Sequence, residues 1–180
     1  ALTGVDYIIT TIRAGGDAGR LFDEQTCLAH GVLGQETTGA GGFAMAIRSV
    51  PTLVYYCTLA REVANPGHLI FNFTNPSGII TQALRSKGFD NVYGICDAPS
   101  GFIKQLEEIL GIPYGTLDIE CYGLNHLSWF RNAKVNGRDV QRELLDNPRT
   151  YEHSEMRLFT REMARISGDC MLNEYLYFYY

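Results

Sequence analysis

Short apolar runs recur along the first two thirds of the chain and are separated by polar or helical stretches. The runs are rich in β-branched and aromatic side chains, and turn-forming Gly, Pro or Asn residues lie near their ends. We predict a strand at each run. These predicted strands span residues 5–12, 68–73, 91–96 and 116–124.

The stretches between these runs have a helical pattern. Ser49 is suited to cap a helix in which Pro51 stands early, and Gly111 is suited to end another. Strands that alternate with helices at this spacing form a parallel, doubly wound sheet, so we predict an α/β fold. The predicted helices span residues 52–64, 77–87 and 100–110, and residues 17–30 predict a short helix and a loop.

The pattern changes after residue 126. Residues 128–138 predict a strand that ends in a turn at Asn136-Gly137, and residues 139–146 and 154–167 predict helices. An aromatic segment, 173–180, follows. We predict the start of a second, mixed α+β domain here.

Polar residues follow three of the predicted strands, where parallel sheets bind their ligands. Asn75 follows the second strand, Cys96 closes the third and His126 follows the fourth. If the third and fourth strands are neighbours in the sheet, the Cys96 thiolate and the His126 imidazole converge and can hold a metal. Ligand type alone indicates zinc or iron, and the alternative is a buried thiol with a structural histidine.

Composition narrows the class of protein. A net charge of −5 and a pI near 5.3 argue against nucleic acid as the main partner. No run of about 18 apolar residues predicts a membrane span, and no leader segment is visible. Five cysteines without a CxxC pair fit reduced thiols in a cytoplasm. The Gly-rich turn that opens a dinucleotide fold is absent, so we expect an excerpt of a longer protein.

Five motifs resemble the NAD- and metal-dependent glycoside hydrolases of family four. They follow the family's order and cover nearly all of the chain, with Gly39-Ala-Gly-Gly42 completing the first of them. The motifs are Gly34-Gln-Glu-Thr37, Phe73-Thr-Asn-Pro-Ser-Gly78, Cys96-Asp-Ala-Pro99, Gly123-Leu-Asn-His126 and Asn173-Glu-Tyr-Leu-Tyr-Phe-Tyr-Tyr180.

The resemblance implies a domain organisation and a substrate. Residues 1–124 would be the C-terminal part of a Rossmann-like NAD-binding domain whose first βαβ unit is missing, and residues 125–180 the start of the catalytic domain. The implied protein is a cytoplasmic enzyme, a dimer or tetramer, that hydrolyses 6-phospho-β-glucosides such as phosphorylated disaccharides. Neither nucleic acid nor membrane is expected as a partner.

The implied reaction is a redox elimination, an exception to the usual pair of carboxylates. NAD removes a hydride from C3 of the sugar, a base removes the C2 proton, and the leaving group departs from C1. Cys96 and His126 match the metal ligands, usually of Mn²⁺, although a thiolate favours softer metals. Two protein ligands leave coordination positions open for sugar oxygens.

Two residues match catalytic positions of the family. Tyr175 is our choice for the C2 base, although Tyr177, Tyr179 and Tyr180 stand in the same segment and an aromatic packing role is the alternative. Asp97 is a candidate acid for the leaving group, with a helix cap as the alternative. An Asp at this position is typical of α-specific members, so a 6-phospho-α-glucosidase is the closest competing reading.

Arg20 and Asn75 match substrate-binding positions. A guanidinium group suits the sugar's 6-phosphate, and the alternative for Arg20 is an exposed surface arginine. For Asn75 the alternative is a plain turn residue. Arg13 and Glu36 are weaker candidates for the same pocket. Outside the family, the chain could belong to an NAD-dependent 2-hydroxy-acid dehydrogenase or be an inactive fragment.

Overall fold

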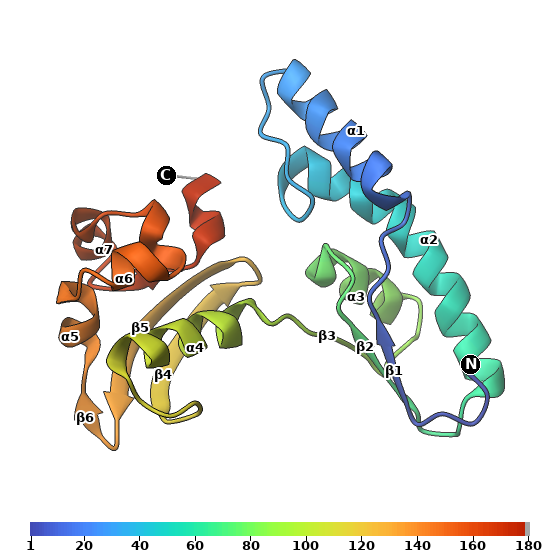
Figure 1. Ribbon diagram of the computed structural model, residues 1–180. Coiled ribbons are helices and arrows are strands. Elements are labelled where there is room, and N and C mark those ends of the chain that lie inside the picture. Colours follow the sequence, from blue (N-terminus) through green and yellow to red (C-terminus); the bar gives the residue numbers. More distant parts are fainter. Residues whose placement is uncertain (179–180) are drawn as a thin grey trace. The chain divides into compact units, whose positions relative to one another are not determined.

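The chain forms two compact units, Ala1–Cys96 and Asp97–Tyr180. The computed structural model describes residues 1–178 and the side chains as far as Leu176. Figure 1 shows the course of the chain through both units, and each unit is described by itself.

The first unit is built on a three-stranded parallel sheet. β1 (Tyr7–Thr10), β2 (Leu69–Asn72) and β3 (Val92–Gly94) lie in the order β1-β2-β3, as the apolar runs predict. Their last residues are aligned, since Thr10 pairs with Asn72 and Asn72 with Gly94. The carboxyl ends of the three strands therefore form one edge.

Three helices accompany this sheet: α1 (Gly16–Ala29), α2 (Gly39–Val63) and α3 (Ser77–Ser86). α2 and α3 pack on the sheet through a common apolar core, which excludes water and supplies the main favourable free energy of this unit. The buried core residues are Leu53, Cys57, Ala60, Ile70, Ile80, Leu84, Phe89 and Val92.

α2 is longer than predicted. It begins at Gly39 instead of residue 52 and continues through Pro51, which has no N–H to donate. Met45, Ser49 and Leu53 follow one another at helical spacing and are all buried, so packing outweighs the break that the proline favours. By length and a mean hydropathy of 1.2, α2 would also pass as a membrane span, but its Leu53 lies in the core of the unit.

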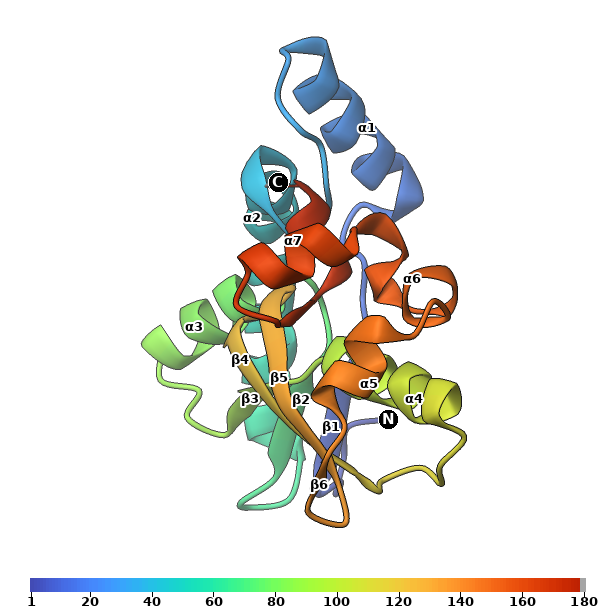
Figure 2. The same ribbon diagram turned by 90° about the vertical axis from the view of Figure 1, so that its left-hand side faces the viewer.

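The second unit is an antiparallel sheet covered by short helices (Figure 2). β4 (Leu117–Leu124), β5 (Leu127–Val135) and β6 (Arg138–Asp139) lie in that order. The short strand β7 (Met171–Leu172) also pairs with β5. The helical segments are α4 (Ala98–Leu110), α5 (Gln141–Asp146), α6 (Thr150–His153), the 3₁₀ turn η1 (Glu155–Leu158), α7 (Arg161–Ile166) and the 3₁₀ turn η2 (Glu174–Phe178).

The α/β fold class is confirmed, with a parallel sheet followed by a mixed α+β region. One strand differs: β4 pairs with β5 in the antiparallel sheet and does not join β3. The two-residue connection Asn125-His126 suits an antiparallel hairpin of β4 with β5, and α4, the expected crossover helix, packs on this second sheet through Phe102 and Phe130. The argument that Cys96 and His126 follow neighbouring strands is therefore wrong.

The two units divide at Cys96 and Asp97, earlier than the predicted boundary between residues 124 and 125. The difference comes from α4. Its Phe102 is fully buried against Phe130 of β5, with the rings edge to face and their centroids 4.8 Å apart. By its contacts, α4 thus belongs to the second unit.

Candidate active site

Polar residues follow all three strands of the parallel sheet at its carboxyl edge. Arg13 lies three residues after β1, Asn75 three residues after β2 and Cys96 two residues after β3. This is the edge at which doubly wound sheets bind ligands.

A buried hydrogen-bond network fixes this edge. The Thr10 hydroxyl donates to Asn72 Oδ1 (2.9 Å), and Asn72 Nδ2 donates to the carbonyl of Thr74 (3.2 Å). The Thr74 hydroxyl in turn accepts from the backbone N–H of Ile12 (3.0 Å). Because buried polar groups are costly to leave unpaired, this network holds the loops after β1 and β2 together.

Asn75 takes the turn role considered for it and also lines a cavity. Its Oδ1 accepts a hydrogen bond from the N–H of Ser77 (3.4 Å), which is the turn role. It also lines a cavity of about 230 Å³ together with Arg13, Glu36 and Met45. The structure therefore brings Asn75, Arg13 and Glu36 to one cavity.

Arg13, Arg20 and Glu36 form one charged cluster. The carboxylate of Glu36 pairs with Arg13 and lies 3.5 Å from Nη1 of Arg20, and it is largely shielded from solvent. Arg20 Nε also donates to Glu24 (2.8 Å), and Arg13 Nε lies 3.2 Å from Asp17. Three carboxylates thus surround two guanidinium groups, so this cluster does not favour a doubly charged phosphate.

The Gly-rich motif explains how Glu36 is held. Gln35 folds back so that its Oε1 accepts hydrogen bonds from the N–H groups of Thr37 and Thr38 at the start of α2. A Cβ atom on Gly41 would lie 2.6 Å from the Gln35 carbonyl oxygen, and one on Gly42 equally close to Thr37. Only glycine permits this close approach of the loop to the helix.

A buried ion pair fixes α1, which carries Arg20, on α2. Asp23 is buried and receives hydrogen bonds from both terminal nitrogens of Arg48, in the two-pronged arrangement typical of Arg and carboxylate. The hydrogen bond to Asp23 raises the pKa of Arg48. Arg48 Nε also donates to the carbonyl of Ala14, near the start of α1.

Cys96 and Asp97 lie on either side of the division between the units. Cys96 is half-buried, two residues beyond β3. Asp97 occupies the N-cap position of α4, but within the described part of the chain its side chain makes no capping hydrogen bond. Asp97 therefore has the position of a helix cap, the alternative role considered for it, but among the described residues its side chain does not make the capping hydrogen bond.

His126 lies in the turn between β4 and β5. It is buried, and its backbone has a φ of 58°, in the left-handed region. The approach of the two strands here is close, because a Cβ on Gly123 would lie 2.3 Å from the Leu127 carbonyl oxygen. The Gly123-to-His126 motif therefore encodes a tight hairpin that presents the imidazole from a fixed backbone.

Tyr175 meets His126 through the pairing of β7 with β5. Leu172 pairs with Trp129, and the N–H of Asn173 donates to the Ser128 carbonyl (3.0 Å), so the register continues past the end of β7. From Glu174 the chain turns into η2, where the ring of Tyr175 contacts His126. Their rings lie edge to face, with centroids 4.2 Å apart and an interplanar angle of 82°. Of the other tyrosines considered as the base, the side chain of Tyr177 and all of Tyr179 and Tyr180 lie outside the described residues.

The buried carboxylate of Glu155, which binds the two residues before Tyr175, was not predicted. Glu155 Oε2 accepts from Asn173 Nδ2 (2.9 Å) and from the N–H of Glu174 (3.1 Å). Burial raises the pKa of the Glu155 carboxyl to about 7. The sequence carries no distinctive signal for it, because Glu155 stands among polar residues such as His153, Ser154 and Arg157.

The proposed metal ligands fit a metal by their chemistry. Among the residues that the structure describes, no group of three or more His, Cys, Asp or Glu side chains could hold a metal ion. A thiolate and an imidazole are both metal ligands, and a pair of them leaves positions open for substrate oxygens. Cys96 lies in the first unit and His126 in the second, so their joint site stays a prediction.

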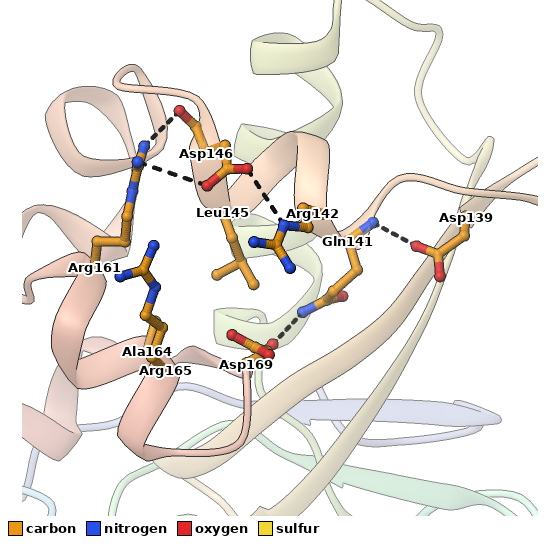
Figure 3. Close-up of a pocket in the computed structure, with 9 residues that line it drawn as sticks. All are labelled: Asp139, Gln141, Arg142, Leu145, Asp146, Arg161, Ala164, Arg165 and Asp169. Carbon is orange, nitrogen blue, oxygen red and sulfur yellow. Dashed lines mark hydrogen bonds and ion pairs between the residues drawn. The ribbon is translucent and has the colours of Figure 1, made fainter.

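A further cavity lies among α5, α7 and the loops beside them (Figure 3). Arg142 and Arg161 both pair with Asp146, each at 3.6 Å, and Gln141 donates to the carbonyl of Asp169 (2.7 Å). None of the predicted site residues lines this cavity among the described residues. Its charges largely satisfy one another, and we assign it no part in the site.

Two family descriptions match the chain. Residues 1–112 match "Family 4 glycosyl hydrolase", and residues 121–180 match "Family 4 glycosyl hydrolase C-terminal domain". Together these ranges contain every residue of the predicted site.

Individual relatives carry phosphoglucosidase names. A 6-phospho-beta-glucosidase of Thermotoga maritima is 38% identical over 148 residues, which are 82% of this chain and 35% of that protein. A 6-phospho-alpha-glucosidase of Lacticaseibacillus paracasei is 36% identical, over 78% of this chain and 32% of that protein. The chain thus spans about a third of the length of the curated relatives it matches.

A solved structure has the same fold. It is the 6-phospho-beta glucosidase from Thermotoga maritima with manganese, NAD⁺ and glucose-6-phosphate. The TM-score is 0.86 at 34% identity, over 99% of this chain and 42% of that one.

Proposed function

This chain belongs to the family 4 glycosyl hydrolases, and on that premise we propose that the whole protein hydrolyses 6-phospho-β-glucosides by an NAD- and metal-dependent redox elimination. The observation that carries the proposal is the contact between His126 and Tyr175, a candidate metal ligand and a candidate base. Two relatives, with their β- and α-glucosidase names, support phosphorylated glucosides as substrates.

In this proposal Tyr175 accepts the C2 proton of the sugar. Cys96 and His126 hold a divalent metal, which when bound stabilises negative charge on the sugar oxygens and makes the C2 proton more acidic. Bound NAD supplies the hydride acceptor, and we assign none of its contacts to this chain. The edge-to-face packing against His126 keeps the phenol of Tyr175 from turning away.

The carboxyl edge of the parallel sheet binds the sugar in this proposal. Asn75 and Arg20 contact hydroxyl groups, which both donate and accept hydrogen bonds and so suit a cluster of mixed charge. This role for Arg20 replaces the expected contact with the 6-phosphate, because carboxylates outnumber guanidinium groups around it. Asp97 protonates the leaving group.

A 6-phospho-α-glucosidase is the second candidate. It is favoured by Asp97 and by the α-glucosidase name of one relative. Family membership argues against the 2-hydroxy-acid dehydrogenase. We also propose a cytoplasmic location and a homo-oligomer, since phosphorylated sugars are retained inside cells and family members often form dimers or tetramers.

The test is hydrolysis of aryl 6-phospho-β- and α-glucosides by the whole protein, with and without NAD⁺ and Mn²⁺. We expect turnover of the β-anomer that requires both additions, and incorporation of solvent deuterium at C2. Turnover without NAD⁺ would contradict redox elimination, and preference for the α-anomer would select the second candidate. Absence of turnover of both anomers by the folded whole protein would contradict the proposed function.

A further inference from the structure

We propose that Glu155 is a positioning residue for proton transfer at C2: its buried carboxylate holds the two residues before Tyr175 and thereby fixes the phenol ring against His126. This inference rests on the proposed function, because it assigns Glu155 a part in placing the base of that reaction. The partners of Glu155 Oε2 lie in the chain immediately before Tyr175.

The first step of the argument is the cost of burying Glu155. The residue is only 7% exposed, and a carboxylate removed from water is costly unless donors surround it. Burial raises the pKa of its carboxyl, and the nearby carboxylate of Glu174 acts in the same direction, while Arg157 opposes both. A side chain that served packing alone would be better replaced by leucine or methionine.

The second step is where the donors come from. Both partners of Oε2 belong to the segment that carries Tyr175: the side-chain amide of Asn173 and the backbone N–H of Glu174. One oxygen therefore holds two consecutive residues. Arg157 strengthens this attachment, since its Nη2 lies 3.4 Å from the Glu174 carboxylate.

The third step connects this anchor to the base. Asn173 uses its other amide atom, Oδ1, to accept a hydrogen bond from the N–H of Tyr175 (3.2 Å). The chain of contacts thus runs from the Glu155 carboxylate through the Asn173 amide to the backbone of Tyr175. The ring of Tyr175 then contacts His126 at 4.2 Å between centroids.

The fourth step is that Glu155 stands on a fixed support. Its N–H donates to the side chain of Gln105 in α4 (2.9 Å), and Ser154 caps the η1 turn by accepting from the Met156 N–H (3.1 Å). The Met156 sulfur accepts from the N–H of Leu172 in β7 (3.0 Å). Elements before and after the hairpin therefore converge on the segment that carries Tyr175.

The experiment compares Glu155→Leu and Glu155→Gln with a matched surface control, Glu152→Leu, in the whole protein. Glu155→Leu keeps the packing volume but removes the acceptor. We expect kcat to fall about 100-fold, as small displacements of a catalytic group can produce, with KM changed less than about threefold. Glu155→Gln keeps one oxygen acceptor and should recover most of the loss, whereas Glu152→Leu should match the parent.

A second measurement separates positioning from general damage. In Glu155→Leu, the kinetic isotope effect for substrate deuterated at C2 should rise, because proton removal becomes more rate-limiting, while the thermal midpoint of Glu155→Gln should stay near that of the parent. Equal kcat in Glu155→Leu and the parent would overturn the proposal, as would a fall without a change in the C2 isotope effect. If Glu155→Leu does not fold, Asn173→Leu decides, because it removes both hydrogen bonds of the amide bridge: an unchanged kcat and isotope effect in that variant would refute the role.

The outcomes also distinguish this proposal from the proposed function. If the parent protein exchanges the C2 proton with solvent and Glu155→Leu exchanges it equally fast, only the positioning role fails. If the parent itself neither hydrolyses the glucosides nor exchanges that proton, the proposed function fails first.

Discussion

The imidazole of His126 and the phenol ring of Tyr175 meet edge to face, with centroids 4.2 Å apart and planes at 82°. Edge-to-face pairs of this kind are favourable and fix ring orientation. The contact depends on the pairing of β7 with β5, which continues as far as Asn173, after which the η2 turn carries Tyr175. Sheet topology thus places a candidate base beside a candidate ligand.

Tyr175→Phe tests the base directly, because it keeps the ring against His126 and removes only the hydroxyl. We expect kcat to fall about 10²–10⁴-fold, the range for loss of a general base, with KM nearly unchanged. Solvent deuterium should no longer enter at C2, as measured by mass spectrometry of the product. The control is Tyr114→Phe, an exposed tyrosine bound to Glu108, which should behave like the parent. Undiminished exchange in Tyr175→Phe would point to another tyrosine of the segment.

Arg20→Met tests whether the charged cluster binds sugar hydroxyls or phosphate. Since Glu24 and Glu36 already surround Arg20, we expect inhibition by glucose 6-phosphate to weaken about tenfold, a hydrogen-bond effect to a charged group, while inhibition by inorganic phosphate stays the same. Inhibition constants for the two compounds provide the comparison. If both weaken alike, the original assignment to the 6-phosphate is restored.

Asp97→Asn tests the acid role through the leaving group. An alcohol leaving group needs a proton, whereas a nitrophenolate leaves readily without one. We expect kcat/KM to fall about 10²-fold for phosphorylated disaccharides, as loss of a general acid predicts, and less than about threefold for nitrophenyl 6-phosphoglucosides. Equal losses for both substrates would indicate that Asp97 acts through the position of α4, where it is the N-cap residue.

The Glu155 carboxyl predicts a pH dependence of stability. Burial raises its pKa from 4.5 to about 7, so between these values the folded protein binds a proton that the unfolded chain has lost. The free energy of unfolding therefore falls as pH rises through this window, and the contribution is fully present only below about pH 4.5. Denaturant titrations across this range should show a smaller fall in Glu155→Gln than in the parent, with Glu152→Gln as the exposed control. Parallel curves for Glu155→Gln and the parent would contradict the raised pKa.

The local pattern of the sequence predicts much of this fold. Alternating apolar and helical stretches predict the α/β class, the three parallel strands and the Asn136-Gly137 turn, because each depends on residues close together in the chain. The position of β4 could not be predicted in the same way. The run 116–124 fits either kind of sheet, and the contact of Phe102 in α4 with Phe130 in β5, which are far apart in the chain, ties α4 to the antiparallel sheet.

The same distinction between local and long-range information applies to the residues of the candidate site. Motifs with distinctive residue types, such as Cys96 and His126, can be found in the sequence. Glu155 cannot, because its role depends on an η1 turn, a strand pairing and an amide bridge that join residues 18 positions apart. The length of α2 could not be predicted for a related reason. Buried contacts on both sides of Pro51 outweigh the preference of proline to interrupt a helix.

Cys96 can be tested as a metal ligand without any activity assay, because the chain carries its own reference thiols. Cys121 is exposed, whereas burial raises the pKa of the Cys57 thiol to about 11 and removes it from solvent. Burial also raises the pKa of the Cys121 thiol, but its exposure leaves it open to the reagent, so alkylation at pH 8, followed residue by residue by mass spectrometry, should label Cys121 faster than Cys57. Addition of Mn²⁺ should slow the labelling of Cys96 and leave Cys121 unaffected. The same addition should protect Cys96 less in His126→Ala, because loss of the second ligand weakens the metal's hold. Labelling of Cys96 at one rate with and without Mn²⁺, in the parent protein, would remove it from the ligand set.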